Sequence, residues 1–495
     1  VALMAKGGNA VDAAIGAAVL LGLCEPQMTG LGGDMFVLMH RPGDGFIGLN
    51  ASGCAPAGLS VDDLRAQGHR QVPSAHPAAI TIPGAVDGFC RLHAHHGCLP
   101  LDAILAPAIH YAEAGVPVAP RVSFDWALAA DGLEPSGKKH FLPWGAAPAP
   151  GTLFQAPGQA EVLRRIAAEG RDGFYAGEVA ADMLATLADI GGTHTEDDFA
   201  ATACTYVEPV ETTYRGHRLV ELPPNGQGAT ALLLANMLET FDVAALDPFG
   251  PDRAHLEAEA TKLAYDARNR FIADPAYTAR LDHLLSRQTA GHLAALIDRT
   301  QVMADPARIS EAVHRDTVLL TVVDRDRLAV SMIYSIFQKF GSGHASDRFG
   351  VLFHDRGRGF SLVQGHPNEA GPGKRPMHTI IPAILAEPDG SLMPFGVMGG
   401  PYQATGHVRI LSNIADYGMT PQAAIDAPRC FAYEGALRIE RGYSAATCDA
   451  LAQLGHTLTV PEEPIGGAQA IRIDATTNVL QGASDPRKDG AALGY

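Results

Sequence analysis

The sequence lacks the features that would place it on nucleic acid or in a membrane. Its 37 lysine and arginine residues are outnumbered by 54 aspartate and glutamate residues, which gives a net charge of −17 at pH 7. An acidic surface repels nucleic-acid phosphates and anionic lipid headgroups, so we expect no nucleic-acid partner and no membrane partner. The longest unbroken apolar run, from Ala13 to Leu23, is well short of the roughly 20 residues that a membrane-spanning helix needs.

Cysteine is scarce and scattered. The seven cysteines are odd in number and form no CxxC pair, which argues against a disulfide framework and against a zinc site. The cluster His93-Ala-His-His96 with Cys98 also has no standard zinc spacing, so we expect no metal and no cofactor. A reducing compartment, the cytoplasm, is favoured. A periplasmic location is the alternative if a leader precedes Val1, because the chain does not begin with methionine.

The chain is rich in helical patterns at first and in strand patterns later. No GxSxG elbow and no P-loop is present, so a serine hydrolase or an NTPase has no support. A helix-rich first part, a sheet-rich second part and a mixed apolar core predict an α+β protein with stacked layers of helix and sheet. The predicted helices are 2–23, 100–118, 159–190, 229–241, 255–271 and 407–417; the predicted strands are 35–39, 214–222, 317–324, 328–337, 380–385, 393–398 and 468–473.

One of the predicted helices carries a dense series of charges. The residues recur at offsets of three and four, which is typical of an ion-paired face exposed to solvent. The series is Glu257, Glu259, Lys262, Asp266 and Arg268.

The junction at Thr317 is the point in the sequence that carries chemistry. A polar stretch that ends at Asp316 is followed at once by a strand that begins with Thr317. If the bond between these two residues is cut, Thr317 holds a hydroxyl and a free α-amine on adjacent carbons. An α-amine titrates near pH 7.7–8.0, so it can accept the hydroxyl proton near neutral pH without a histidine partner.

A colinear series of motifs along nearly the whole chain resembles the γ-glutamyltransferase family. The resemblance implies a four-layer αββα Ntn-hydrolase sandwich, made as one precursor and self-cleaved into residues 1–316 and 317–495. It leaves open a dimer of these two parts. The motifs are Lys6-Gly-Gly-Asn-Ala-Val-Asp-Ala-Ala14, Glu25-Pro26, Gly30-Leu-Gly-Gly-Asp34, the hairpin from Thr317, Phe340-Gly-Ser-Gly343, Pro372-Gly-Lys-Arg-Pro376, Gly399-Gly400, Asp416-Tyr-Gly-Met419, Asp426-Ala-Pro-Arg429, Gly482-Ala-Ser-Asp-Pro-Arg487, Asp489-Gly490 and Gly494-Tyr495.

The resemblance also implies roles for individual residues. Thr317 becomes the nucleophile, first against the carbonyl of Asp316 and then against an amide substrate. Ser335 matches the hydroxyl that steadies the nucleophile, although an ordinary strand serine is the alternative. Gly399 and Gly400 match the glycine pair whose backbone N–H groups hold the developing oxyanion. The partners of the chain are then a small amide and the two fragments of the precursor.

The match fails at the substrate pocket. Ser52 stands where the family carries an arginine for the substrate carboxylate, and Gly359 replaces the aspartate that binds the substrate ammonium. A buried ammonium without a counter-ion costs several kcal/mol, so a γ-glutamyl group is expected to bind poorly. Phe337 replaces an asparagine, and His378-Thr379 replaces a pair of serines.

Arg356 stands where typical members carry an uncharged amide. Its planar guanidinium suits a carboxylate, so the expected substrate is an amide of a small acid without an α-amine, as in the oxamate amidohydrolase branch of the family. The alternatives are a γ-glutamyl transferase or hydrolase, a glutaryl-cephalosporin acylase, and an uncut scaffold without activity. Arg356 itself could instead belong to a surface or structural ion pair.

Overall fold

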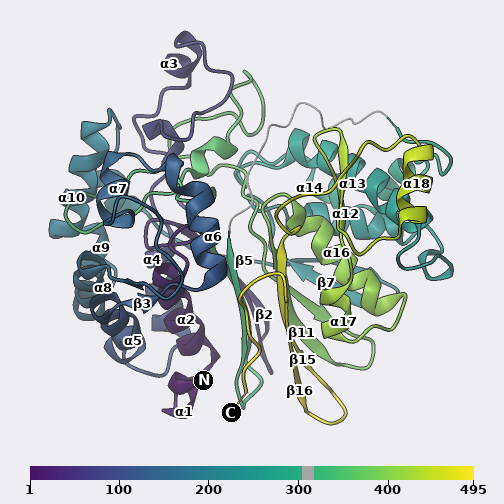
Figure 1. The fold of residues 1–495 in the computed structure, drawn as a ribbon, viewed down its shortest axis with the longest axis horizontal. Coiled ribbons are helices and arrows are strands. Elements are labelled where there is room, and N and C mark those ends of the chain that lie inside the picture. Colours follow the sequence, from purple (N-terminus) through teal and green to yellow (C-terminus); the bar gives the residue numbers. More distant parts are fainter. Residues whose placement is uncertain (304–316, 495) are drawn as a thin grey trace.

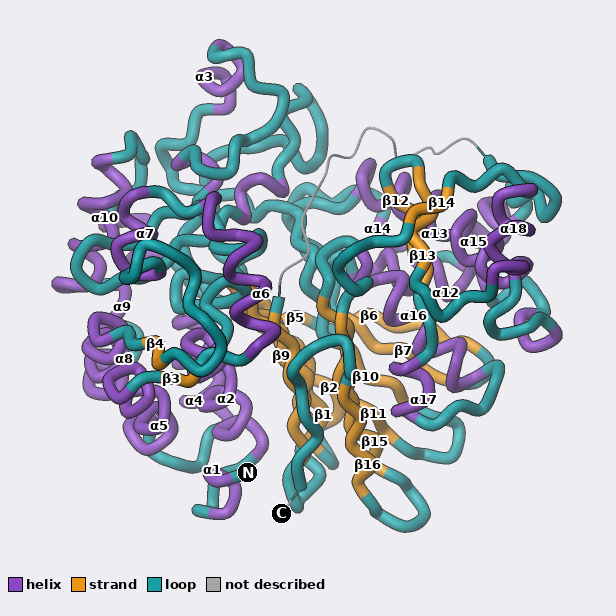
Figure 2. The backbone as a smooth tube through the Cα atoms, viewed as in Figure 1, coloured by secondary structure: helices purple, strands orange, loops and turns teal. Residues whose placement is uncertain are grey.

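A computed structural model describes residues 1–303 and 317–494 of the chain. Two antiparallel sheets lie face to face in the middle of the molecule, and helices cover the outer side of each (Figure 1). In Figure 2 the strands gather in this central region while the helices flank it on both sides. The order of layers is therefore helix, sheet, sheet, helix, which confirms the predicted αββα architecture.

The first sheet contains the β-hairpin predicted at the junction. The two strands of this hairpin pair around a tight turn, in which Asp324 Oδ1 accepts hydrogen bonds from the N–H groups of Asp326 (3.0 Å) and Leu328 (3.1 Å). Every residue of the return strand is buried, as its branched and apolar side chains predict. In order across the sheet, the strands are β5 (Thr205–Val207), β2 (Gly45–Ala51), β1 (Asp34–Arg41), β9 (Ala329–Ser335) and β8 (Val318–Val323).

The second sheet takes strands from both sides of the predicted junction. Its inner side meets the first sheet through apolar side chains such as Phe36, Ile333 and Ile384. Because the segments before and after residue 316 each contribute strands to both sheets, they build one fold together. In order across the sheet, the strands are β16 (Leu480–Ser484), β15 (Gly467–Ile473), β11 (Leu392–Met398), β10 (Ala383–Ala386), β7 (His217–Glu221) and β6 (Val210–Tyr214).

In the first outer layer, the helices Ala10–Cys24 and Ala85–His96 contact the first sheet directly, and most of the others lie farther out. The predicted helix 2–23 is two helices, divided around Gly7, whose φ of 95° is not helical. The second begins at the capping residue Asn9, whose side chain accepts the N–H groups of Val11 and Asp12 (3.0 Å each). The helices are α1 (Ala2–Ala5), α2 (Ala10–Cys24), α3 (Val61–Ala66), α4 (Ala85–His96), α5 (Leu101–Ala114), α6 (Pro120–Ala129), α7 (Pro135–Phe141), α8 (Pro157–Glu169), α9 (Asp172–Tyr175), α10 (Gly177–Asp189) and α11 (Glu196–Ala201).

The second outer layer contacts the second sheet through α12, α16 and α17, while α13 packs on α12. Two small sheets, β3 (Val116–Pro117) with β4 (Leu153–Phe154), and β12 (Cys430–Tyr433) with β13 (Ala436–Ile439) and β14 (Leu458–Thr459), lie outside the central pair. The helices are α12 (Gly228–Leu238), α13 (Pro251–Phe271), α14 (Leu281–Leu285), α15 (Arg287–Ala294), α16 (Tyr402–Ala415), α17 (Pro421–Asp426) and α18 (Ala445–Gln453).

The predicted solvent-exposed charged face of α13 is wrong. Of the five residues in that series only Asp266 is not buried. Glu257 pairs within the helix with Arg253 (2.8 Å) and across to Arg409 of α16. Glu257, Glu259 and Lys262 are therefore paired inside the helical layer, because other segments cover the face that the sequence pattern assigns to water.

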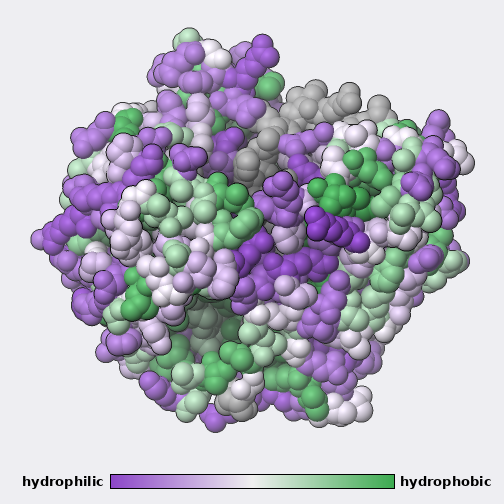
Figure 3. Space-filling view, viewed as in Figure 1, coloured by the Kyte–Doolittle hydropathy of each residue, from purple (hydrophilic) through white to green (hydrophobic). Residues whose placement is uncertain are grey.

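The surface shown in Figure 3 mixes hydrophilic and apolar residues, and it is hollowed in the lower part of the view, near the chain termini of Figure 1. No helix in residues 1–303 or 317–494 combines the length and the apolar character needed to cross a bilayer.

Candidate active site

Thr317 lies at one end of a row of buried polar residues that crosses the first sheet. Val318 pairs with Tyr334, so Thr317, one residue earlier, comes opposite Ser335, and its Oγ1 donates to Ser335 Oγ at 3.2 Å. On the other side of β9, Ser335 pairs directly with Asp34 of β1. All three polar side chains are buried. The register of the sheet therefore brings Thr317, Ser335 and Asp34 onto three neighbouring strands.

Ser335 Oγ connects the predicted nucleophile to Arg356. Besides the bond from Thr317, it accepts the N–H of Phe337 (2.9 Å) and a contact from Arg356 Nη2 (3.4 Å). Arg356 Nη1 donates to Thr379 Oγ1 (3.2 Å), and its guanidinium carbon lies 4.0 Å from the centre of the Phe337 ring. These contacts bring Thr317, Ser335, Phe337, Arg356 and Thr379 into one cluster.

Arg356 is fully buried, so it is not a surface residue. No carboxylate among the described residues lies within ion-pair distance of its guanidinium, and its Nε is buried without a hydrogen-bond partner. Burial lowers the pKa of Arg356 to about 9, while the charges of Asp34 and Asp355 work against that shift. A buried guanidinium of this kind gains stability from a bound carboxylate.

Phe337 is held in an unusual backbone conformation. Its φ of 77° lies in the left-handed region, which a bulky side chain rarely adopts. In this conformation its N–H donates to Ser335 Oγ while its ring lies against the Arg356 guanidinium. Backbone strain of this kind concentrates at functional sites.

Asp34 accepts hydrogen bonds on both carboxylate oxygens. Gly53 N–H (3.0 Å) and Gly84 N–H (3.2 Å) donate to Oδ1. On Oδ2, His378 Nε2 lies at 3.2 Å and His354 Nδ1 at 3.5 Å. Burial works to raise the pKa of Asp34, but the neighbouring groups, His354 first, lower it below its ordinary value, so the carboxylate is ionised.

The His378 ring lies beside this cluster, against Asp34. Burial, followed by the charge of Arg356, lowers the pKa of His378 to about 3, so its ring is neutral. The N–H of Ile380 points to Nδ1 (3.4 Å), which leaves the proton on Nε2, where it is donated to Asp34. Thr379, the next residue, contacts Arg356, whereas the ring of His378 contacts Asp34.

The glycine pair follows β11. Gly399 has a φ of 133°, and a Cβ there would lie 2.8 Å from Gly466 Cα; Gly400 has a φ of 55°. Gln227 Nε2 donates to the carbonyls of both Gly400 (3.1 Å) and Thr379 (2.6 Å). The Gln227 side chain therefore ties the glycine pair to the residue that contacts Arg356.

Alanine at the two glycines is expected to have unequal effects. At Gly399 a side chain meets backbone in addition to the strained φ, so Gly399→Ala should lower the free energy of unfolding by about 2–3 kcal/mol. At Gly400 the left-handed conformation costs about 1–2 kcal/mol for alanine. Thermal denaturation of both variants tests this; equal losses of stability would contradict the steric argument for Gly399.

Two of the positions that depart from the family pattern, Ser52 and Gly359, leave no room for a longer side chain next to their neighbours. Ser52 Oγ donates to Asn50 Oδ1 (2.7 Å) and accepts from Asn225 Nδ2 (3.2 Å). A Cβ on Gly359 would lie 2.6 Å from the carbonyl oxygen of Met377. An aspartate at Gly359 therefore has no room without a backbone shift.

A group with metal-binding residue types lies elsewhere, in the second helical layer. The ligand atoms of His255, Glu259 and His456 lie within 4.8 Å of one another. His255 Nδ1 and His456 Nε2 are 2.7 Å apart, and Glu259 accepts from Lys262 Nζ (2.7 Å) and from Met303 N–H (2.8 Å). Hydrogen bonds within the protein already satisfy these groups, so we interpret the cluster as structural.

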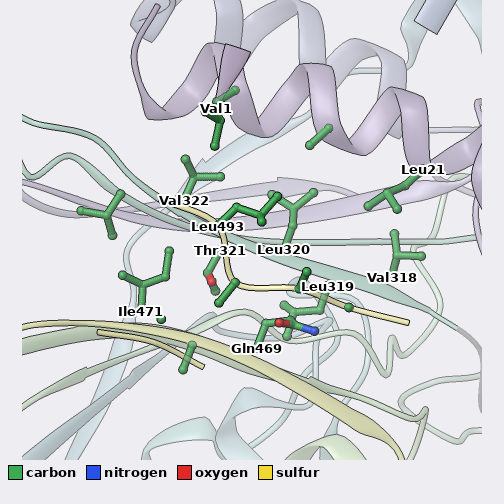
Figure 4. A pocket seen from close by; sticks show the side chains of 18 of the residues that line it. Val1, Leu21, Val318, Leu319, Leu320, Thr321, Val322, Gln469, Ile471 and Leu493 are labelled. Carbon is green, nitrogen blue, oxygen red and sulfur yellow. The ribbon is translucent and has the colours of Figure 1, made fainter. Parts of the chain in front are cut away.

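A cavity of about 1050 Å³ runs along β8 from Thr317 toward the chain termini (Figure 4). Its lining is largely apolar and includes Leu21, Val318 and Leu320. Arg356, Phe337, His378 and Thr379 do not line it. The cavity therefore meets the polar cluster around Ser335 only at Thr317.

The structure thus brings together most of the residues predicted for the site, while Asp316 lies outside the described residues. Sequence reasoning missed Asp34, His354, Asn225 and Gln227 as site residues. Asp34 ends the Gly-Leu-Gly-Gly-Asp motif and is the single acid in an apolar segment. Because a buried acid needs a partner, its position in the sequence could have indicated a site residue.

Two antiparallel sheets between helical layers, with Thr317 leading directly into a strand of the first, define an enzyme of the Ntn-hydrolase class. The gamma-glutamyltranspeptidase family model matches residues 1–495. The chain therefore belongs to the gamma-glutamyltranspeptidase family.

Named relatives divide among several activities. The glutathione hydrolase-like YwrD proenzyme of Bacillus subtilis is 35% identical over 509 residues, covering 99% of this chain and 95% of its own length. The oxamate amidohydrolase proenzyme of Klebsiella pneumoniae is 32% identical over 512 residues, covering 100% and 96%. The crystal structure of cephalosporin acylase from Bacillus halodurans matches with a TM-score of 0.91 and 36% identity, covering 100% of this chain and 93% of its own.

Proposed function

We propose that the chain is a self-processing amidohydrolase that uses Thr317 to hydrolyse the amide of a small carboxylic acid such as oxamate. The observation that carries the proposal is the buried guanidinium of Arg356, which lies 3.4 Å from the oxygen of Ser335, the direct hydrogen-bond partner of Thr317. A carboxylate bound there stands close to the nucleophile.

In the self-processing step the hydroxyl oxygen of Thr317 attacks the carbonyl carbon of Asp316. The carbon–nitrogen bond between the two residues breaks, the nitrogen takes up a proton and becomes the α-amine of Thr317, and an ester joins the two parts. Water then opens the ester, which releases a carboxylate on residue 316 and restores the hydroxyl. The products are a fragment that ends at Asp316 and a fragment that begins at Thr317.

The hydrolytic step uses the same hydroxyl. The α-amine takes its proton while the oxygen attacks the substrate carbonyl, and the backbone N–H groups at Gly399 and Gly400 stabilise the oxyanion. The carbon–nitrogen bond of the amide breaks, ammonia leaves with that proton, and water hydrolyses the acyl-enzyme to the free acid. Ser335 holds the Thr317 oxygen in place throughout.

Distances limit the length of the acid. Ser335 Oγ lies 3.2 Å from Thr317 Oγ1 and 3.4 Å from Arg356 Nη2, so these two atoms are at most about 6.6 Å apart. The attacking oxygen must lie roughly 3 Å from the substrate carbonyl carbon. The substrate carboxylate must lie about 2.8 Å from Arg356 to form a charged hydrogen bond. These two distances account for most of the available separation. In oxamate the two carbonyl carbons are about 1.5 Å apart, whereas a glutaryl chain would have to fold back on itself.

A series of acid amides tests the proposal. The cleaved protein should release ammonia from oxamate, more slowly from malonamate and succinamate, and slowest from glutaramate and from γ-glutamyl anilides. The expected loss in kcat/KM from oxamate to glutaramate is roughly 10²-fold or more. Faster turnover of γ-glutamyl or glutaryl substrates would overturn the assignment of Arg356 and favour the alternative activities.

A further inference from the structure

Arg268 is a second buried arginine that the site reaches through one hydrogen bond. It lies near the end of α13, and its Nη1 donates to Gln227 Oε1 (2.9 Å). Its Nε donates to Asn269 Oδ1 (3.0 Å), and its guanidinium carbon lies 4.3 Å from the centre of the Tyr265 ring. Within the part of the chain that the structure describes, no carboxylate lies within ion-pair distance of Arg268.

A buried arginine without an anion is costly to keep in the fold. Burial lowers the pKa of Arg268, and the hydroxyl groups of Tyr265 and Tyr433 work against that shift. An apolar side chain of similar volume in place of such a charge often leaves a protein equally stable or more stable. Stability alone therefore does not account for an arginine at this position.

Arg268 fixes the orientation of the Gln227 amide. A guanidinium only donates hydrogen bonds and a backbone carbonyl only accepts them. Oε1 of Gln227 therefore faces Arg268, while Nε2 donates to the carbonyls of Thr379 (2.6 Å) and Gly400 (3.1 Å). Turning the amide around would place its oxygen against both carbonyl oxygens and its N–H groups against the guanidinium.

The two carbonyls belong to the two halves of the proposed site. Thr379 Oγ1 accepts from Arg356 Nη1, and Arg356 is the group proposed to bind the substrate carboxylate. Gly400 belongs to the pair proposed to stabilise the oxyanion. The bound acid needs only the first half, whereas the transition state needs both at once, so their separation matters most in the transition state.

We propose that Arg268 is a positioning residue for amide hydrolysis, which acts through Gln227 to hold Thr379 and Gly400 at the separation that the transition state requires. This inference rests on the proposed function and adds to it a residue that does not touch the substrate. It places the effect of Arg268 on kcat and not on the binding of the acid.

The experiment measures kcat for oxamate and the inhibition constant of malonate with cleaved Arg268→Met. Methionine fills much of the same space but donates no hydrogen bond, so the Gln227 amide loses the partner that orients it. We expect kcat to fall roughly 10- to 10²-fold, at or below the loss of one oxyanion donor. Malonate has carboxylates but no amide, so its inhibition constant should stay within about twofold of the parent value. Thermal stability should change little, because the charge removed has no ion-pair partner.

Two further variants test the route through Gln227. Arg268→Lys keeps a donor for Oε1 and should retain kcat within roughly fivefold of the parent. Gln227→Met should lower kcat about as much as Arg268→Met. The double variant should be no slower than either single variant, because both substitutions break the same link.

Arg253→Gln is the matched control, a buried arginine at the other end of α13. The Arg253 side chain donates to Glu257 (2.8 Å), to the Pro248 carbonyl and to Ser412, and Glu257 keeps Arg409 as a second partner. This variant should lose thermal stability while its kcat stays within a factor of a few of the parent.

The outcomes separate the two claims. A parent that hydrolyses no acid amide would overturn the proposed function and this inference with it. If the parent hydrolyses oxamate, an Arg268→Met enzyme with lower stability but the kcat of the parent would overturn the role of Arg268 alone. So would a double variant whose losses in kcat multiply. Should Arg268→Met not fold, an unchanged kcat in Gln227→Met would overturn the role as well.

Discussion

Thr317→Ala is expected to leave the protein as one uncut polypeptide and to abolish amide hydrolysis. Without the hydroxyl, neither the bond before residue 317 nor the substrate amide has an attacking group. The loss should be on the order of 10⁴-fold or more, as for other enzymes that lose a covalent nucleophile. A denaturing gel and an ammonia assay measure the two effects separately.

Thr317→Ser is the matched control, because it keeps the hydroxyl that Ser335 accepts from. It should still yield two fragments divided before residue 317 and retain measurable turnover. Two bands from the alanine variant, or a parent enzyme whose small fragment does not begin Thr-Val-Leu-Leu, would refute the assignment of the nucleophile. A parent that stays as one band would favour the uncut scaffold.

Arg356→Gln is expected to lower kcat/KM for oxamate by roughly 10²- to 10³-fold, which is typical for removing one partner of a buried charge pair. Glutamine retains a hydrogen-bonding group for Thr379 but cannot balance a carboxylate. The kcat/KM of Arg356→Lys should lie between that of the parent and that of Arg356→Gln, since lysine keeps the charge but loses the planar two-point geometry. Kinetics on cleaved protein measure the effect, so that defects in processing are not counted.

Arg358→Gln controls for the loss of any arginine in this segment. Arg358 lies two residues away and its Nη1 is 3.8 Å from Asp355. It does not contact Ser335 or Thr379, so oxamate hydrolysis should stay within a factor of a few of the parent. If Arg356→Gln were no worse than this control, Arg356 would be structural and the acid would bind elsewhere.

The sequence predicts the fold well where local patterns decide it. The hairpin at 317–337 combines branched residues with a charged turn, and the structure places β8 and β9 there. The continuous apolar run before Glu25 predicts an enclosed helix, which α2 is. Both predictions depend only on residues close together in the chain.

The failures arise where burial depends on distant residues. The charges of α13 have the spacing of a solvated face, and nothing within the helix indicates that Arg409, over 140 positions later, is its partner. In the same way, Asp34, His354 and His378 meet only through the sheet register and the loop before β10. A single sequence shows the residue types of such a network but not their proximity.

The shared sheets have a consequence for the two predicted fragments. In each sheet the strands of one fragment form a continuous block that pairs with the block of the other along one seam, β1 with β9 in the first sheet and β7 with β10 in the second. Separating the fragments would break the hydrogen-bond ladder at both seams and expose the apolar layer between the sheets. The two fragments are thus expected to remain an obligate pair, and supplying them from independent genes should succeed only when both are present while they fold.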